Sequence, residues 1–287
     1  MLPALRELFG EGVDTLSPAS ISRLKQRWTE DYKAWSKRSL AEKQYAYIWV
    51  DGIHFNVRMS ENKLCTLVVM GATKEGEKEL IAIEGGYRES TESWSYLLRD
   101  LKTRGMKPPK LFIGDGALGF WAAAAEVYPE SRNQRCWVHK TANILDKLPK
   151  KLQAKAKTML HEMYLAETKA DALVAHRSFI ETYEAKYPKA VKCLNDSYEA
   201  LFAFYDFPAK HWCHIRTTNP IESTFATVRK RTYATRGQGT EASTLAFAFK
   251  LAEEASKTWR RLRGHETIIK LYDPSIIFED GHEKLVA

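Results

Sequence analysis

Three acidic side chains stand where a protein could bind a metal ion. Asp51 ends the apolar run YIWVDG and Asp115 ends LFIGDG, so each is predicted at the carboxyl end of a buried strand, beside a loop. Glu222 follows Asn219, a good N-cap, and Pro220, which fits the first helical turn, so it is predicted at the start of a helix. Three carboxylates brought together in this way would form an oxygen-only site that suits Mg²⁺ or Mn²⁺ with substrate phosphates completing the shell.

Such a site suits phosphodiester cleavage, because two metal ions about 4 Å apart can activate a water or hydroxyl and stabilise the leaving oxygen. We expect Asp51 to bridge the two ions, with Asp115 and Glu222 each completing one side. Each residue alone has a structural alternative. Asp-Gly pairs are common in turns, and Glu222, three residues after Asn219, fits a capping box. The joint arrangement of the three favours the metal site.

Cysteine and histidine form a second candidate group. Cys136 and His139 occur in QRCWVHK, and HWCHIR at 211–216 could add Cys213 with His211 or His214 to make a zinc site. The spacing in the second segment is tight for a structural zinc site, and buried thiols are common. We therefore expect His139 to lie near the carboxylates and to contact a phosphate or a water. The four cysteines include no CxxC pair, which predicts free thiols.

The chain has 44 Lys and Arg against 36 Asp and Glu, and its net charge of +8 favours a polyanionic partner. Basic residues concentrate between 132 and 157 and again after Glu222, which predicts a track of phosphate contacts. A solvated basic face is the alternative. No apolar run approaches the roughly 20 residues of a membrane span, so we expect a cytoplasmic protein. The candidate phosphate contacts are Arg135, Lys140, Lys147, Lys150, Lys151, Arg229, Lys230, Arg231 and Arg236.

The order of the predicted elements indicates the fold class. Within residues 45–140, three β-rich runs (YAYIWVDG, LCTLVVMGAT and ELIAIEGGY) precede a helix, the strand KLFIGDG, a second helix and the short run QRCWVH. This βββαβαβ order, with acids closing the first and fourth strands, is that of a ribonuclease-H-like mixed sheet in an α/β protein. Residues 141–209 are predicted to be an all-helical insertion before the third acid, and 210–287 to complete the core with a final helix.

Residues 1–44 are predicted to be helical. Ser17 is a candidate N-cap, Pro18 fits the first turn, and apolar residues up to Trp28 follow at helical spacing. These helices could pack on the main domain as an ordinary amphipathic pair. Alternatively, they could be the remnant of a helix-turn-helix DNA-binding region, since the helix also has a basic face with Arg23 and Arg27.

Several segments together resemble a known family. YIWVDGIHFNVR, GGYRESTESWSYLLRDLKTRGM, LFIGDGALGF, QRCWVHK and TTNPIESTFATVRKRT resemble, in order and spacing, the motifs of bacterial insertion-sequence transposases of the Mutator type. The resemblance runs from about residue 13 to 263. It implies a ribonuclease-H-like core, a DDE triad at Asp51, Asp115 and Glu222, a C-x-x-H motif at Cys136 and His139, and a helical insertion. It also implies that family members have a longer N-terminal region, which reads the terminal inverted repeats of the element.

The sequence thus predicts the catalytic region of a DNA transposase that uses Mg²⁺ or Mn²⁺ to cleave a strand at the element end. The freed 3′-hydroxyl would then attack the target. The expected partners are double-stranded DNA, both terminal inverted repeats and target, and further copies of the chain on that DNA in the bacterial nucleoid. Two alternatives are a ribonuclease-H-type nuclease with the same metal site and a truncated, non-catalytic protein that binds DNA or regulates transposition.

Overall fold

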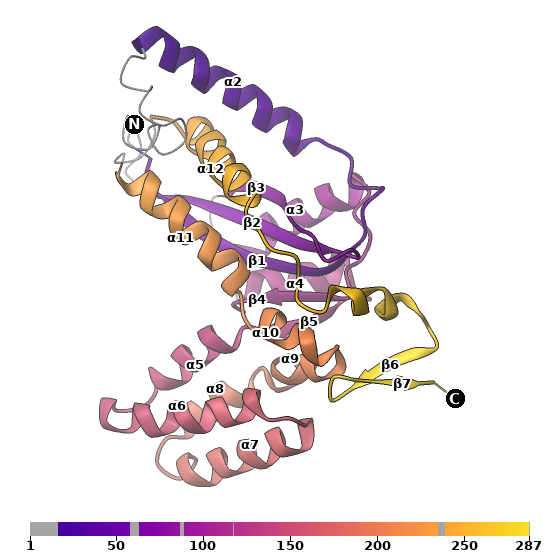
Figure 1. The fold of residues 1–287 in the computed structure, drawn as a ribbon. Helices are drawn as coiled ribbons and strands as arrows, with labels where there is room; N and C mark the ends of the chain where they lie inside the picture. The colour runs from indigo at the N-terminus through magenta and orange to yellow at the C-terminus, as the bar shows by residue number, and fades with distance from the viewer. Residues whose placement is uncertain (1–16, 58–62, 87–88, 117, 235–238, 287) are drawn as a thin grey trace.

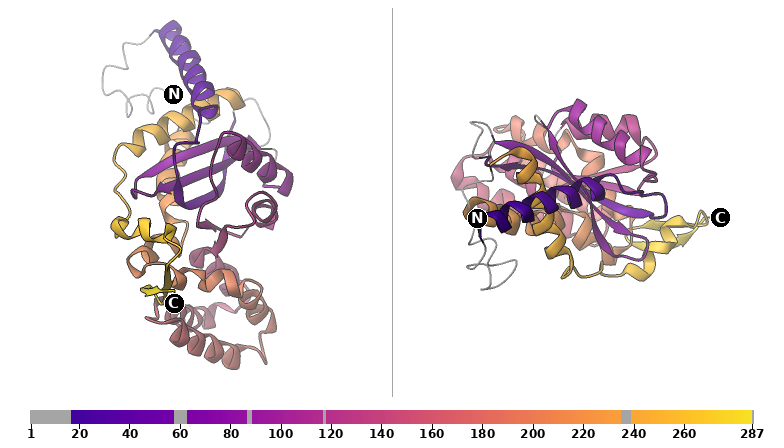
Figure 2. Two further views of the ribbon diagram at one scale, coloured as in Figure 1. Left: turned by 90° about the vertical axis from the view of Figure 1, so that its right-hand side faces the viewer. Right: turned by 90° about the horizontal axis from the view of Figure 1, so that it is seen from above.

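The computed structural model describes residues 17–57, 63–86, 89–116, 118–234 and 239–286. Its centre is a five-stranded mixed sheet with helices on both faces, and a group of helices lies beyond one edge of that sheet (Figures 1 and 2). The chain therefore has the α/β class that the sequence predicts. Among the described helices, none is both long and apolar enough to cross a membrane.

The sheet has the strand order β3-β2-β1-β4-β5. Its strands are β1 (Tyr45–Phe55), β2 (Leu64–Thr73), β3 (Lys78–Gly86), β4 (Leu111–Gly114) and β5 (Arg132–Arg135). The first three are antiparallel neighbours, whereas β4 runs parallel to β1 and β5 runs parallel to β4. Helix α3 (Thr91–Thr103) connects β3 to β4, and α4 (Leu118–Val127) connects β4 to β5. The order of elements from β1 to β5 is the predicted one.

Asp51 does not close its strand. It lies within β1, because the antiparallel partner β2 pairs with β1 from Tyr45 to Phe55 and places Val68 opposite Asp51. The parallel partner β4 pairs only with Tyr47 to Trp49 of β1. Asp51 therefore stands two residues beyond the parallel part of the strand, at the same edge as Asp115, which directly follows β4. The sequence pattern located the edge correctly but placed the end of the strand too early.

Alternate residues of β1 belong to two hydrophobic cores. Ile48 and Val50 belong to the core that contains the buried side chains of α3 and α4. Tyr47 and Trp49 belong to the other core, which α11 (Asn219–Ala234) and α12 (Glu241–Ser256) cover. Because successive side chains of a strand point to opposite faces, Asp51 emerges on the face that α11 covers. The remaining described α-helices are α2 (Pro18–Ser36), α5 (Trp137–Leu145), α6 (Lys150–Leu165), α7 (Lys169–Tyr183), α8 (Pro188–Asn195), α9 (Tyr198–Phe202) and α10 (Trp212–Ile215).

Helix α2 packs on the sheet through α12. Ser17 caps it by accepting a hydrogen bond from the backbone N–H of Ser20 at 3.1 Å. Ring centroids of Trp28 and Phe247 lie 5.9 Å apart, and the hydroxyl of Tyr32 donates to the carbonyl of Ile83 at 2.7 Å. The apolar side of α2 is thus used in packing. The structure describes one continuous helix from 18 to 36, and residues 1–16, the other part of the predicted N-terminal region, lie outside the described residues.

Helices α5 to α9 lie beyond β5 and share the core of the α11 face (Figure 1). The ring centroids of Trp137 and Phe202 are 5.6 Å apart, and those of Tyr47 and Phe207 are 5.8 Å apart. Aromatic packing therefore continues from β1 into the helices. At the C-terminal end, β6 (Ile276–Glu279) and β7 (His282–Leu285) form a separate antiparallel hairpin.

Candidate active site

The two predicted aspartates lie on adjacent parallel strands, and α11 brings Glu222 to them. Asp51 stands on β1, Asp115 follows β4, and Glu222 lies in the first turn of α11, which packs on β1. Burial, and then the charges of Asp115 and Glu222, together raise the pKa of Asp51 to about 7, against the opposing charge of His139. Asp115 and Glu222 are therefore close enough to Asp51 to oppose its ionisation.

Glu222 belongs to a second, tighter group with Cys136 and His139, whose ligand atoms all lie within 4.8 Å of one another. His139 Nδ1 lies 3.4 Å from Cys136 Sγ and 3.7 Å from Glu222 Oε1. Cys136 caps the start of α5 directly after β5, and His139 follows in the first turn, so the short β5–α5 connection brings both to α11. The structure thus brings the predicted His139 next to one of the predicted carboxylates.

Thr218 links this group together. Its backbone N–H and its hydroxyl both lie in hydrogen-bond contact with Cys136 Sγ, at 3.4 and 3.3 Å, and the hydroxyl also donates to Glu222 Oε1. The Glu222 carboxylate is thus held by the side chain four residues earlier. Asn219 N–H donates instead to Thr217 Oγ1 at 3.4 Å, so the capping-box alternative for Glu222 is not the arrangement present.

Hydrogen bonds in this group favour a charged pair. Burial opposes ionisation of Cys136, but hydrogen bonds from His139 and Thr218 outweigh it and lower the pKa of the thiol. The hydrogen bond with Cys136, together with the charges of Cys136, Glu222 and Asp115, raises the pKa of His139 to about 9 against the opposing effect of burial. A protonated His139 places a positive charge beside the carboxylates at neutral pH.

Two predicted phosphate contacts are buried instead. Arg135 is 7% exposed, and its guanidinium lies against Gly116, behind the loop that carries Asp115. Lys140 is 4% exposed, and its Nζ donates to Ser197 Oγ at 3.0 Å. Neither side chain is presented to a DNA backbone, so we correct both assignments. Their positions in a basic stretch gave no sign of burial, which arises from the packing of β5 and α5 against the rest of the chain.

The other predicted contacts differ in their exposure. Five of them are exposed, one on the α5–α6 connection, two at the start of α6 and two on α11: Lys147, Lys150, Lys151, Arg229 and Lys230. Arg231 is half-buried, and Arg236 lies outside the described residues.

The alternative zinc site is not formed. Cys213 is exposed, and its thiol donates to the carbonyl of Lys210 at 3.7 Å. The His211 ring is held by the hydroxyl of Tyr47 at 2.7 Å and by the carbonyl of Gly264 at 2.8 Å. The residues at 211–214 do not join Cys136 in a group of metal-ligand spacing within the described part of the chain. All four cysteines are free thiols, as predicted.

The chain matches the family model described as "Transposase, Mutator family" over residues 4–262. It is also 48% identical over 279 residues to the transposase for insertion sequence element IS6120 of Mycolicibacterium smegmatis, an alignment that covers 97% of this chain and 86% of the relative. The chain belongs to the Mutator family of transposases. The IST2 transposase of Acidithiobacillus ferrooxidans is 46% identical over 289 residues, covering 98% of this chain and 95% of the relative. The ISRM5 transposase of Rhizobium meliloti (strain 1021) is 30% identical over 282 residues, covering 90% and 69%.

Sequence reasoning missed two polar residues of this transposase that contact the site. Thr218 precedes α11 in TTNP, a position where a hydroxyl commonly serves a helix start, and that signal could have found it. Glu89 follows β3 and rests against Gly52, where an added Cβ would lie 1.9 Å from Glu89 Oε1. Burial raises the pKa of Glu89, and the charge of Asp115 raises it further. No local pattern marks Glu89, because its proximity depends on the sheet bringing β1 beside the segment after β3.

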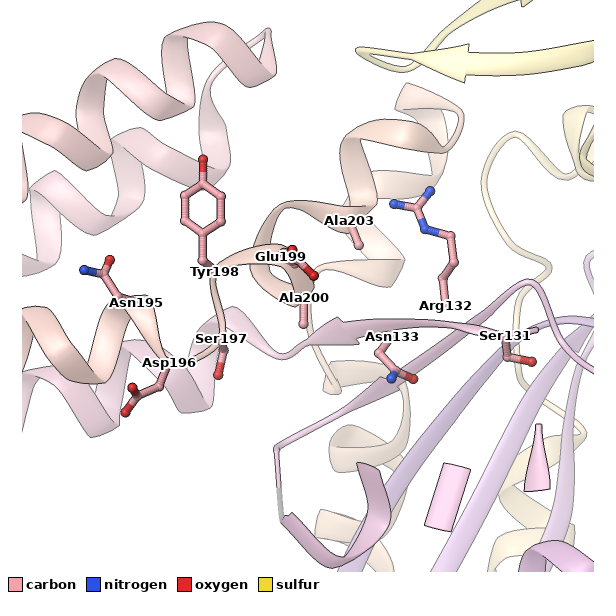
Figure 3. Close-up of a pocket in the computed structure, with 10 residues that line it drawn as sticks. All are labelled: Ser131, Arg132, Asn133, Asn195, Asp196, Ser197, Tyr198, Glu199, Ala200 and Ala203. Atoms are coloured by element: carbon pink, nitrogen blue, oxygen red, sulfur yellow. The ribbon is translucent and has the colours of Figure 1, made fainter. Parts of the chain in front are cut away.

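A cavity of about 670 Å³ lies away from the carboxylates, between β5 and the connection from α8 to α9 (Figure 3). Polar side chains from both elements line it, among them Asn133 and Arg132 on β5 and Tyr198 and Glu199 on α9. None of the predicted catalytic residues lines this cavity, so we assign it no part in the chemistry.

Proposed function

We propose that this transposase cleaves DNA strands at the ends of its insertion sequence and joins them to target DNA, with Asp51, Asp115 and Glu222 as its metal-binding triad. The observation that carries the proposal is the raised pKa of Asp51. After burial, the charges of Asp115 and Glu222 are its largest causes. The sheet has the strand order β3-β2-β1-β4-β5, in which β1, β2 and β3 are antiparallel neighbours and β4 and β5 run parallel to β1. This mixed order supports a ribonuclease-H-like core.

The chemistry of the donor set fits a hard divalent cation. A cation among the three carboxylates would offset the effect of Asp115 and Glu222 on Asp51, and oxygen ligands are those that Mg²⁺ and Mn²⁺ prefer. The three carboxylates would together hold a pair of such ions. Bound Mg²⁺ or Mn²⁺ would supply an activated water or 3′-hydroxyl and would stabilise the leaving oxygen.

The chain's own residues hold the carboxylates and add one positive charge. Asp51 is fixed by the pairing of β1 with β2, while Thr218 holds the Glu222 carboxylate. His139, protonated at neutral pH, stands beside Glu222 and can donate a hydrogen bond to a phosphate oxygen of the bound DNA. The loop with Asp115 rests on the buried guanidinium of Arg135.

Removal of the Thr218 hydroxyl is expected to slow cleavage without unfolding the protein. Thr218→Val keeps the volume and the backbone hydrogen bond to Cys136 but leaves Glu222 without its side-chain donor, so we expect a loss of roughly 10–100-fold, as for a residue that orients a metal ligand. Thr218→Ser keeps the hydroxyl and should retain most of the activity. Single-turnover cleavage with each variant tests this, and equal losses with Val and Ser would remove the positioning role.

We propose that double-stranded DNA binds along the exposed basic residues of the α5–α6 connection, the start of α6 and α11. Lys147, Lys150 and Lys151 lie at the start of the helices beyond β5, and Arg229 and Lys230 follow Glu222 on α11. The basic groups thus begin near the carboxylates and continue onto the helices of residues 141–209, which we propose as the DNA-contacting insertion. The proposed partners are the terminal inverted repeats, the target DNA and a further copy of the chain on the same DNA.

Neutralising the exposed lysines of this surface should flatten the salt dependence of DNA binding. Replacing Lys147, Lys150, Lys151, Lys155 and Lys157 by Gln should lower the slope of log affinity against log salt by up to about 0.9 per lost phosphate contact.

The matched control replaces lysines that already pair with carboxylates elsewhere, namely Lys257, Lys270 and Lys284, and should change the slope little. The test is the affinity for duplex DNA measured over a range of salt concentrations. An equal change in slope per lysine in both sets would show that the first set lies on a solvated face that does not contact DNA.

The proposed function is tested with the full chain, Mg²⁺ or Mn²⁺, a duplex that carries the inverted repeats flanking its own gene, and a plasmid target. Cleaved ends joined to the target support transposition. Metal-dependent cleavage without joining would instead indicate a ribonuclease-H-type nuclease, and binding without cleavage would indicate a non-catalytic DNA-binding protein.

A further inference from the structure

A second group of metal-ligand spacing lies on the sheet next to the proposed triad. It consists of His54, Cys65 and Glu89, whose ligand atoms all lie within 4.8 Å of one another. His54 of β1 and Cys65 of β2 are direct partners in the antiparallel register, so their side chains emerge on the same face. Glu89 reaches the same place from the segment between β3 and α3. Three elements that are distant in sequence thus converge on one point.

Gly52 makes this convergence possible. The Glu89 side chain lies against it so closely that a Cβ at position 52 would stand 1.9 Å from Oε1 and 2.0 Å from Cδ of Glu89. Gly52 and His54 alternate with Asp51 and Ile53 along β1, so the group lies on the α3 side of the sheet, where Cys65 is packed. Asp51 emerges on the opposite face. The group therefore lies on the other face of the sheet from Asp51, while its Glu89 is near enough to Asp115 for that charge to act on it.

The donor types point to a different ion from the one proposed for the triad. A thiolate, an imidazole and a carboxylate are the usual ligands of Zn²⁺, whereas Mg²⁺ takes oxygen ligands. We propose that His54, Cys65 and Glu89 bind a zinc ion that ties β1 and β2 to the start of α3. Cys65 is 2% exposed while His54 is exposed, so the ion would be anchored on the buried side, and its fourth position would face water.

Zinc bonds of about 2.0–2.3 Å hold neighbouring ligand atoms about 3.5 Å apart in a tetrahedron. The three donors, which lie within 4.8 Å of one another, would therefore need to close by no more than roughly 1.3 Å on binding. The other described group, Cys136, His139 and Glu222, has similar ligand types, but its sulfur already lies within hydrogen-bond distance of Thr218 N, Thr218 Oγ1 and His139 Nδ1. We therefore favour the group at Cys65.

Cobalt titration of the full chain tests the site without reading catalytic activity. The protein is treated with a chelator, freed of it, and titrated with Co²⁺, which takes the place of zinc and gives a sulfur-to-metal absorption band when a cysteine binds it. We expect one such band, and its loss when one equivalent of Zn²⁺ is added. Cys65→Ser should abolish the band, and His54→Ala and Glu89→Gln should each weaken Co²⁺ binding by more than about tenfold, at least the effect of losing an outer-shell partner.

Three controls make the result specific. His54 is exposed, so His54→Ala should fold normally even where Cys65→Ser does not, and circular dichroism checks this. Cys193→Ser alters a half-buried cysteine outside both groups and should leave the band unchanged. Cys136→Ser should also leave it unchanged. A wild-type protein with no band, a band that survives His54→Ala at full affinity, or a band lost in Cys136→Ser would each overturn the proposal.

Discussion

Asp51→Asn, Asp115→Asn and Glu222→Gln should each slow metal-dependent DNA cleavage by roughly 10³-fold or more, which corresponds to about 4 kcal/mol of activation free energy. Each substitution removes a charge from the proposed metal site and leaves the side-chain volume almost unchanged. Asp51→Asn should show the largest loss, because Asp51 is buried and the charges of both other carboxylates act on it. Single-turnover cleavage of a labelled duplex in Mg²⁺ measures the effect.

A matched control is Asp146→Asn, which neutralises an exposed aspartate at the end of α5. This variant should cleave at the wild-type rate. The triad variants should also keep the wild-type circular dichroism spectrum, since neutralising one of three repelling carboxylates does not weaken the fold. Near-normal cleavage by any one of the three would remove that residue from the triad.

The second large effect is expected at Gly116, beside Asp115. Gly116 has φ of 89°, in the left-handed region that favours glycine, and a Cβ there would lie 0.9 Å from Nη1 of the buried Arg135. In Gly116→Ala the guanidinium or the loop must therefore move, and Asp115 moves with the loop. We expect cleavage to fall by roughly 10²-fold, the scale of a misplaced catalytic group, with a stability loss of about 1–3 kcal/mol.

Gly76→Ala separates the two consequences. Gly76 also has a positive φ, of 80°, but it lies in the turn between β2 and β3, where an added Cβ would meet His265. This variant should lose comparable stability and yet cleave normally at temperatures where it is folded. Chemical denaturation and single-turnover cleavage are measured for both. Equal cleavage by the two variants would show that the contact between Gly116 and Arg135 does not position Asp115.

Much of this arrangement could be predicted from local patterns. The alternation of apolar residues and the turn signals predicted the order of strands and helices. Serine is a common N-cap, and Ser90 has this role before α3, where it accepts a hydrogen bond from Ser93 N–H. The two aspartates were placed at one sheet edge because parallel strands end together. These features depend on residues close in sequence.

What could not be predicted depends on contacts between distant segments. The length of β1 beyond Asp51 is set by its pairing with β2, and the burial of Arg135 and Lys140 is set by the packing of β5 and α5. The same holds for the hydrogen bonds between Thr218 and Cys136, which join α11 to the start of α5. Composition marks a basic stretch, but it does not distinguish a lysine on the surface from one that tertiary packing buries.

The central claim, that Asp51, Asp115 and Glu222 together hold the divalent cation, is tested most directly by measuring Mn²⁺ bound to the complex of the chain with duplex DNA. Water-proton relaxation reports the bound ion, and wild type, Asp51→Asn, Asp115→Asn and Glu222→Gln are compared at equal DNA occupancy. We predict that Asp51→Asn loses bound Mn²⁺ at concentrations that saturate the wild type, and that Asp115→Asn and Glu222→Gln each weaken binding by at least about tenfold, as expected for removal of a charged ligand. Unchanged Mn²⁺ binding in all three folded variants would contradict the account.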